Sequence, residues 1–160
     1  MECVLNERRI KYEDGELYWW YSHTRNRPLK NPRWIKFKQT ICGSRKTYYK
    51  TMEVKGKKYK VHRVIYKIHN PDWDIGDTSK TNEIDHIDKI TFNNNIENLR
   101  VVTNQQNSFN RNFKGYSYDK RYNSYRVRIT IDGESKSFNF KTEEEAIKKR
   151  AELKIKYHTI

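Results

Sequence analysis

The chain has 160 residues, a formal net charge of +14 and a mean hydropathy of -1.16. Its length allows one ordinary domain or two small ones. Leu, Ile, Val and Phe make up 33 of the 160 residues, which limits the size of any hydrophobic core. Cys3 and Cys42 stand alone without a C-x-x-C motif, which argues against a zinc ribbon and against a disulfide framework.

The charge is unevenly distributed along the chain. Residues 1–70 carry 18 Lys/Arg against 6 Asp/Glu, residues 71–110 carry 3 against 7, and residues 111–160 carry 13 against 7. Two basic regions therefore flank an acidic centre. The basic regions favour a polyanionic partner, and a nuclease needs carboxylates to hold a divalent cation against a phosphate. An acidic surface loop without function is the alternative.

The sequence also bounds the location of the protein and its partners. Its first 16 residues contain no apolar segment typical of a secretory signal, and no run of about 18 apolar residues occurs in the chain. We therefore expect an intracellular, soluble protein in the cytoplasm that does not bind a membrane. A polyanion is the expected partner, no protein partner is evident, and the protein is expected to be a monomer or a homodimer.

Residues 1–70 are expected to form a basic, β-rich, DNA-binding region that ends in a short helix. Asp14-Gly15 and Lys55-Gly56 each predict a hairpin turn between strands. The segment 25–38 is basic and contains prolines, so it is predicted to be a loop that follows a phosphate backbone.

The short helix at the end of this region is predicted from the spacing of its apolar residues. Val61, Val64, Ile65 and Ile68 recur at the spacing of one helix face. Asn70-Pro71 is then expected to end the helix.

Residues 71–112 are predicted to form a strand, a loop, a second strand and a helix. The strands are expected at Ile84–Asp88 and Leu99–Val102, and Asn93–Asn95 belongs to the loop between them. Thr103 with Gln106 three residues later is a capping-box pattern, which starts a helix that runs to about Asn110.

Residues 113–160 are predicted to form a three-stranded sheet followed by a helix. Strands are expected near Tyr116–Asp119, Tyr125–Ile131 and Ser135–Phe140, with a turn at Asp132-Gly133 and a helix from the Thr142–Glu145 capping box to about Tyr157. Side chains alternate between the two faces of a strand. Val127 and Ile129 should therefore face the helix, while Arg126 and Arg128 face outward.

The acidic centre contains the residue types that phosphodiester hydrolysis requires. The reaction needs a nucleophilic water, a base that takes its proton, and positive charge that stabilises the phosphate and the leaving oxygen. Asp85 and Asn107 offer hard oxygen donors that suit Mg²⁺ or Mn²⁺, and a histidine such as His86 can serve as the base. Adjacent strand residues point to opposite faces, so His86 would need a twisted or bulged strand to reach the substrate.

The segment IDHIDKITFNNNIENLRVVTNQQN, residues 84–107, resembles the HNH nuclease family, most closely its phage and intron homing endonucleases. This resemblance implies an α+β fold whose ββα-metal (His-Me finger) core wraps two strands and a helix around one cation. It also implies that His86 is the general base and that Asp85 and Asn107 hold one Mg²⁺ or Mn²⁺ ion per active site. Asn98 would hold the long loop and orient the histidine. A phage-infected bacterial cell is the implied location.

The segment departs from the family pattern at two positions. Lys89 stands where many relatives have glycine, and the last position is asparagine where histidine gives the family its third letter. Alternative oxygen donors are present in Asn94 and Asn95, and Asn104 or Asn110 would replace Asn107 if the helix register were shifted. Upstream, His62 is equally consistent with a contact to phosphate or the active site and with a structural role.

The C-terminal part resembles the Apetala/ethylene-response-factor DNA-binding domain. The resemblance is carried by Gly115-Tyr116, Tyr125-Arg126-Val127, Gly133, Phe138, Phe140 and 142–146. It implies a three-stranded sheet laid in the major groove of DNA, with the alternative of a basic, solvated sheet face. The residues expected to contact DNA are Arg33, Lys36, Arg63, Lys120, Arg121, Arg126 and Arg128.

These patterns together favour a metal-dependent endonuclease that nicks or cuts double-stranded DNA, of the homing type. A restriction-type or phage-packaging nuclease on the same scaffold is the nearest alternative. A non-catalytic DNA-binding regulator is an alternative of another class, and its expected mark would be the loss of His86 or the metal ligands, which are present.

Overall fold

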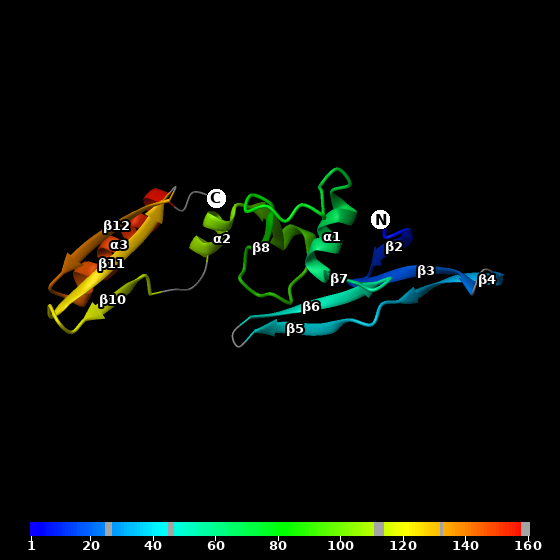
Figure 1. The fold of residues 1–160 in the computed structure, drawn as a ribbon, viewed down its shortest axis with the longest axis horizontal. Coiled ribbons are helices and arrows are strands. Elements are labelled where there is room, and N and C mark those ends of the chain that lie inside the picture. The colour runs from blue at the N-terminus through cyan, green and yellow to red at the C-terminus, as the bar shows by residue number, and fades with distance from the viewer. Residues whose placement is uncertain (25–26, 45–46, 111–113, 132, 158–160) are drawn as a thin grey trace. The chain divides into compact units, whose positions relative to one another are not determined.

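A computed structural model describes residues 1–24, 27–44, 47–110, 114–131 and 133–157. The chain forms two compact units, Met1–Val101 and Val102–Ile160 (Figure 1). Both combine helices with small sheets, as expected for the α+β class. Among the described residues, no helix is long and apolar enough to cross a membrane.

The first unit begins with a four-stranded antiparallel sheet in the order β1-β2-β3-β4. Its strands are β1 (Glu2–Leu5), β2 (Arg8–Glu13), β3 (Glu16–Thr24) and β4 (Arg27–Lys36). The predicted hairpin at Asp14-Gly15 is confirmed, because both residues have positive φ angles, of 50° and 78°, as a tight hairpin turn requires.

The prediction of a loop over residues 25–38 is wrong for residues 27–36. These residues form β4, which lies at the edge of the sheet beside β3. Pro28 and Pro32 lie within this strand. An edge strand tolerates proline because it forms ladder hydrogen bonds on one side alone.

A second antiparallel sheet, β5-β6-β7, precedes the first helix. Its strands are β5 (Thr40–Ser44), β6 (Thr47–Val54) and β7 (Lys57–Lys60), and α1 spans Val61–His69. The predicted hairpin at Lys55-Gly56 is confirmed, with φ angles of 46° and 80°. The predicted helix is confirmed as well, and Asn70 is its C-cap.

One hydrophobic core unites the sheets and α1 of the first unit. The four apolar residues at helical spacing on α1 are buried in it together with Ile10 and Leu17 of the first sheet and Met52 and Val54 of the second. Ile84 and Leu99, from the acidic centre (residues 71–110), belong to the same core. The candidate site is therefore anchored to the hydrophobic core of the unit.

The acidic centre contains a two-stranded sheet. Its strands are β8 (Glu83–His86) and β9 (Leu99–Val102), with the 3₁₀ helix η1 (Ile96–Asn98) between them. The first strand ends two residues earlier than predicted, because Ile87 and Asp88 form a turn and Lys89 has a φ of 65°.

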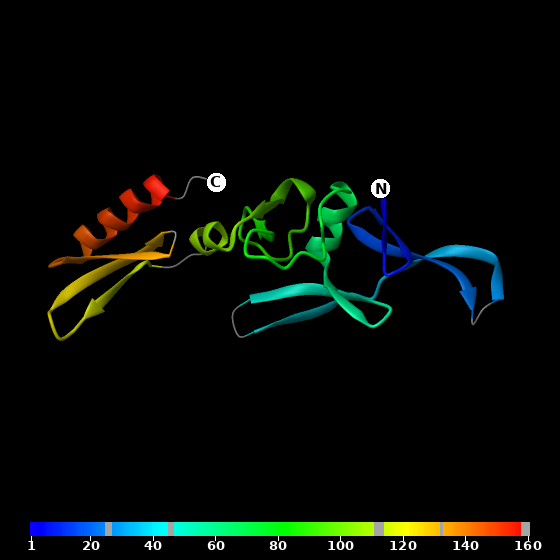
Figure 2. The ribbon, with the colours of Figure 1, turned by 45° about the horizontal axis from the view of Figure 1, so that its top comes forward.

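The second unit contains α2 (Asn104–Asn110), β10 (Tyr116–Asp119), β11 (Ser124–Ile131), β12 (Glu134–Phe140) and α3 (Glu143–Tyr157). The three strands form an antiparallel sheet in chain order, and α3 packs along it (Figure 2). Both capping boxes are confirmed: Thr103 and Gln106 exchange hydrogen bonds of 2.8 and 3.1 Å, and Thr142 and Glu145 exchange two of 3.3 Å.

The alternation predicted for the middle strand is also confirmed. Val127 and Ile129 are buried in a core with Ala146 and Leu153 of α3, while Arg128 is exposed. The turn predicted at Asp132-Gly133 falls on Asp132, which lies outside the described residues.

Candidate active site

Asp85 and His86 lie at the end of β8 and are both buried, with exposed fractions of 7% and 4%. A buried carboxylate is costly unless a partner compensates its charge. Arg100, on β9, supplies that partner: its Nε and Nη2 donate hydrogen bonds of 3.1 and 2.9 Å to Asp85 Oδ2. The sequence patterns did not identify Arg100 as a site residue, because no local pattern links it to Asp85.

The imidazole of His86 is enclosed by side chains from three other segments. Its Nε2 lies 3.0 Å from Asn94 Oδ1, in the loop that follows β8. Its ring centroid lies 5.0 Å from that of His62 on α1 and 6.2 Å from that of Tyr49 on β6. These neighbours restrict the orientation of the histidine ring.

His62 is 3% exposed and packs within the first unit. Burial lowers the pKa of His62 well below its ordinary value of 6.5, and the nearby His86, Lys60 and Arg63 lower it further. The side chain is therefore neutral at physiological pH. This environment favours the structural alternative for His62 over a contact with phosphate.

The loop from Ile87 to Asn98 is closed by hydrogen bonds of Asn98. Its Oδ1 accepts a bond of 3.0 Å from the Asp88 backbone N–H, and its Nδ2 donates to Asp88 Oδ1 at 2.9 Å and to the Asn93 carbonyl at 2.8 Å. The Ile87 N–H donates to the Asn98 carbonyl at 3.0 Å. The two ends of the loop are thereby joined directly after His86.

Asp88 takes part in the same network as an acceptor. Desolvation acts to raise its pKa, but hydrogen bonds from Asn93, from the Ile90 backbone N–H and from Asn98 outweigh it. The pKa of Asp88 is therefore held below its ordinary value of 3.8. Asp88 stays ionised and keeps the loop closed at neutral pH.

Asn107 lies on α2, in the second unit, whereas Asp85 lies in the first. Its backbone N–H donates to the Thr103 carbonyl at 2.9 Å, so the residue sits in the first full turn of the helix. The alternatives Asn104 and Asn110 lie on the same helix. Coordination of one cation by Asp85 and Asn107 together stays a prediction.

The donor chemistry of these residues fits a hard cation. Within the described part of the chain, no group of three or more His, Cys, Asp or Glu side chains could hold a metal ion. One carboxylate and one amide, completed by water and phosphate oxygens, is instead a ligand set that suits Mg²⁺ or Mn²⁺.

Arg63, expected to contact DNA, has a structural role that the sequence did not indicate. Its guanidinium donates hydrogen bonds of 3.0, 3.1 and 2.9 Å to the carbonyls of Asn82, Ile75 and Asp77. It also lies 4.7 Å from the ring centroid of Trp73. These contacts fasten the segment between α1 and β8 to the helix.

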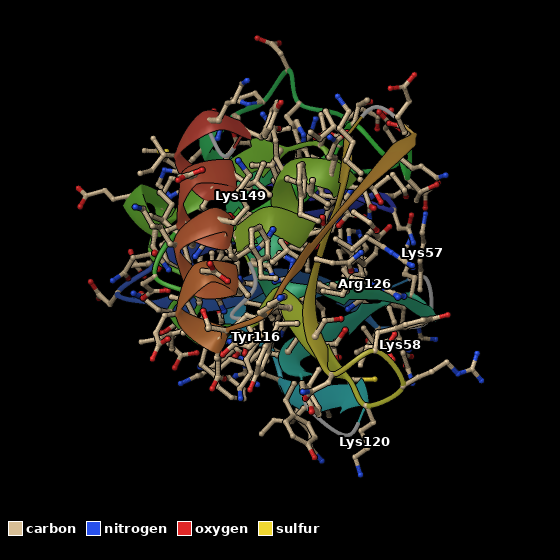
Figure 3. All side chains as sticks on the ribbon, turned by 90° about the vertical axis from the view of Figure 1, so that its left-hand side faces the viewer. Lys57, Lys58, Tyr116, Lys120, Arg126 and Lys149 are labelled. Carbon is tan, nitrogen blue, oxygen red and sulfur yellow. The ribbon has the colours of Figure 1, made fainter. Side chains whose placement is uncertain are left out.

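The remaining basic candidates lie at the surface of their own units. Arg33 and Lys36 are exposed on β4, with Lys36 paired to Glu16 at 3.0 Å. In the second unit, Lys120 and Arg121 are exposed in the turn between β10 and β11. Figure 3 shows Lys120 extending from this turn and Arg126 on the sheet.

The two arginines of β11 differ in their surroundings. Arg126 donates a hydrogen bond of 2.9 Å to Asp119 on β10 and one of 3.3 Å to Asn139 on β12. Arg128, two residues along the same face, is exposed. Arg128 therefore presents its charge to solvent, while that of Arg126 is partly compensated.

Comparison with known proteins gives one match. Residues 59–109 match a family model described as HNH endonuclease, and this segment contains Asp85, His86, Asn98 and Asn107. No significant match was found among curated proteins or among solved structures. The segment that carries the buried Asp-His pair is thus similar to the HNH endonucleases.

Proposed function

We propose that the protein is a metal-dependent HNH endonuclease that hydrolyses phosphodiester bonds in double-stranded DNA. The observation that carries the proposal is the buried pair Asp85–His86 at the end of β8, inside the segment that matches the HNH endonuclease model. The net charge of +14 supports a polyanionic substrate.

His86 is assigned as the general base, which takes a proton from the attacking water. Its ring is held by Asn94, His62 and Tyr49, and a base must be held in a fixed geometry to act efficiently. Asn98 is assigned as the residue that closes the loop after the histidine, which its four hydrogen bonds support.

Asp85 and Asn107 are proposed to hold one Mg²⁺ or Mn²⁺ ion. When bound, the cation would stabilise the negative charge of the pentavalent phosphate and of the leaving 3′ oxygen. Arg100 already offsets the charge of Asp85 at one oxygen, so the carboxylate is preformed in its buried position before a cation arrives.

Basic residues on the two units are proposed to bind the DNA backbone. They are Arg33 and Lys36 on β4, Lys120 and Arg121 in the turn between β10 and β11, and Arg126 and Arg128 on β11. The outward face of the C-terminal sheet resembles the Apetala/ethylene-response-factor type. Arg63 is left out of this set because its guanidinium is held by three carbonyls. A monomeric homing endonuclease that nicks one strand per binding event fits a chain with one Asp-His site.

The test is incubation of supercoiled plasmid with the protein and Mg²⁺, comparing wild type with His86→Ala. The wild type should convert plasmid to the nicked form, and excess EDTA should stop the reaction. The variant should bind DNA and fail to cut it. His23→Ala is the matched control, because His23 is exposed on β3 and its loss should leave cleavage unchanged.

Two outcomes would overturn the assignment. Cleavage by His86→Ala at the wild-type rate would show that another group is the base. Binding of DNA by the wild type without any cleavage, over a range of sequences and divalent cations, would instead favour the non-catalytic regulator.

A further inference from the structure

We infer that the solvent-facing side of α3 is a docking surface for a second copy of this chain, whose own α3 binds it in the antiparallel direction. The surface consists of an apolar stripe, which is Ile147, Ala151 and Ile155, and of the charged residues that border the stripe. The inference does not rest on the proposed function, because it concerns a surface outside the Asp-His site.

The apolar stripe lies on the side of α3 that faces away from the sheet. Its residues are four positions apart, which places them on one face of a helix. The residues that pack α3 on the sheet are different ones, since Ala146 and Leu153 are buried in the core of the second unit (Figure 2). By contrast, Ile147 and Ile155 are 50% and 82% exposed, and Ala151 is exposed as well. The helix therefore has two apolar sides, and one of them is left open by the described residues.

The charges along α3 favour a second α3 as the occupant of the stripe. The first turn carries Glu143, Glu144 and Glu145, and the last turn carries Lys154 and Lys156. Two antiparallel copies bring the acidic turn of each helix beside the basic turn of the other, whereas a parallel pair brings like charges together. The helix dipoles also favour the antiparallel pair. One surface thus supplies both complementary ends, as a two-fold interface between identical chains requires.

The register of the two helices follows from the smallest residue of the stripe. With Ala151 of both copies at the two-fold axis, the helix axes can approach closely, and Ile147 of each copy faces Ile155 of the other. Lys148 and Glu152 border the stripe on one side, because each follows a stripe residue by one position. In this register Lys148 of one copy lies about 3 Å along the axis from Glu152 of the other. The two-fold axis makes this oppositely charged pair twice.

The strength of the association can be bounded from the same contacts. Glu152 is already paired with Lys149 at 3.0 Å, but an exposed pair of this kind contributes little, so Glu152 can exchange its partner at small cost. The stripe is shorter than a standard protein interface. The dimer should therefore be weak, with a Kd between about 1 and 100 µM. At lower concentrations the chain is a monomer.

Dimerisation brings together two chains that each carry one Asp-His site at the end of β8. Under the proposed function, a single chain nicks one strand per binding event. Two chains joined through α3 carry one site for each strand of a duplex.

Sedimentation equilibrium of the full chain, without DNA and without metal, tests the association directly. Protein concentrations from about 1 to about 400 µM cover the expected range of Kd. A reductant is included because Cys42 is exposed. The average mass should rise from that of the monomer, 19.6 kDa, toward twice this value. A chain that stays monomeric over the whole range would overturn the inference.

Removal of the apolar stripe tests where the two chains meet. Ile147→Ser combined with Ile155→Ser should raise the Kd at least about tenfold, and both positions are exposed, so the fold should be retained. Val4→Ser is the matched control, because Val4 is 62% exposed on β1 and its loss should leave the Kd unchanged. An unchanged Kd in the stripe variant would overturn the inference, and so would an equal loss in Val4→Ser.

A charge exchange tests the antiparallel register. Lys148→Glu places a like charge against Glu152 of the second copy and should raise the Kd at least about threefold at low salt, and Glu152→Lys should do the same. The double variant has the net charge of the wild type and should restore its Kd. A double variant that associates no better than either single variant would overturn the antiparallel pairing. None of these readouts involves DNA, so a failure of cleavage would contradict the proposed function and leave this surface standing.

Discussion

The imidazole of His62 lies edge-on to that of His86, with 5.0 Å between ring centroids and 82° between ring planes. Both residues are buried, with exposed fractions of 3% and 4%. A charge on His62 would therefore be placed in a poorly solvated site beside His86. The neutral state of His62 therefore contributes to the stability of this cluster. Acidification should destabilise the fold by protonating His62.

We predict that the free energy of unfolding falls with acidification below about pH 6.5, the ordinary histidine pKa, in part through His62. The folded-state pKa of His62 lies well below 6.5, so between the two values the unfolded chain binds a proton that the folded chain does not. Each pH unit in this window should remove up to about 1.4 kcal/mol. Urea unfolding at pH 5 to 8 measures the slope.

His62→Phe should flatten this slope, since phenylalanine fills a similar volume and does not titrate. His23→Gln, at an exposed position, should keep the wild-type slope. Equal slopes for the wild type and His62→Phe would mean that His62 is protonated in the folded protein.

A second prediction concerns the pair Asp85–Arg100, whose side chains are 8% and 26% exposed. Arg100→Met removes the guanidinium that pairs with this buried carboxylate and should lower the free energy of unfolding by about 3 kcal/mol in EDTA. Asp85→Asn combined with Arg100→Met should recover most of this loss. Thermal or urea unfolding of the single and double variants measures the coupling.

The exposed pair Lys149–Glu152, at 3.0 Å, provides the control for this pair. Lys149→Met should cost no more than about 0.5 kcal/mol. Mg²⁺ should stabilise Arg100→Met if Asp85 binds the cation as proposed. An Arg100→Met variant as stable as the wild type would show that the buried pair contributes nothing net.

Features set by neighbouring residues could be predicted from the sequence. The hairpins at Asp14-Gly15 and Lys55-Gly56 follow from the positive φ that a tight turn demands, and the capping boxes follow from side chains three residues apart. The alternation of β11 follows from strand geometry. In each case the signal and its consequence lie within a few residues.

Features set by tertiary contacts could not be predicted. The contact of Arg100 with Asp85 spans 15 residues, and that of Arg63 with the Asn82 carbonyl spans 19, so both depend on the fold. β4 was predicted to be a loop because its prolines and charges disfavour an interior strand. The same prolines and charges are compatible with an edge strand. Only the order of strands in the sheet shows that this segment is an edge strand and not a loop.

A third prediction concerns the loop closed by Asn98. Asn98→Ala removes two hydrogen bonds with Asp88 and one with Asn93, and should lower the free energy of unfolding by about 2 kcal/mol. Amide exchange at Asp88 should accelerate, because its N–H loses its acceptor. The rate of DNA cleavage by Asn98→Ala should also fall, because the same loop holds Asn94.

Asn98→Asp should not restore the loop, because it places a second carboxylate against Asp88 and lacks both donors. Exchange at Ile131, in the second unit, serves as the internal control and should keep its wild-type rate. If Asn98→Ala keeps wild-type exchange at Asp88, the loop is held by other contacts.

The last prediction concerns the unequal arginines of β11. Arg128 is exposed, so if it binds phosphate, Arg128→Ala should reduce the slope of log K against log salt by about 0.9. Arg126 is paired to Asp119 at 2.9 Å. Its removal exposes the Asp119 charge and should weaken binding by repulsion, most strongly at low salt because salt screens exposed charges. Fluorescence anisotropy of a labelled duplex, in the non-cutting His86→Ala background, measures both.

Lys148→Ala is the matched control because Lys148 is exposed on α3, which packs against the opposite face of the sheet. Its loss should leave the slope unchanged. A slope that responds to Lys148 and not to Arg128 would place DNA on the helix side. The outward sheet face would then be a solvated surface, and the resemblance to a major-groove-binding sheet would not describe how this unit binds DNA.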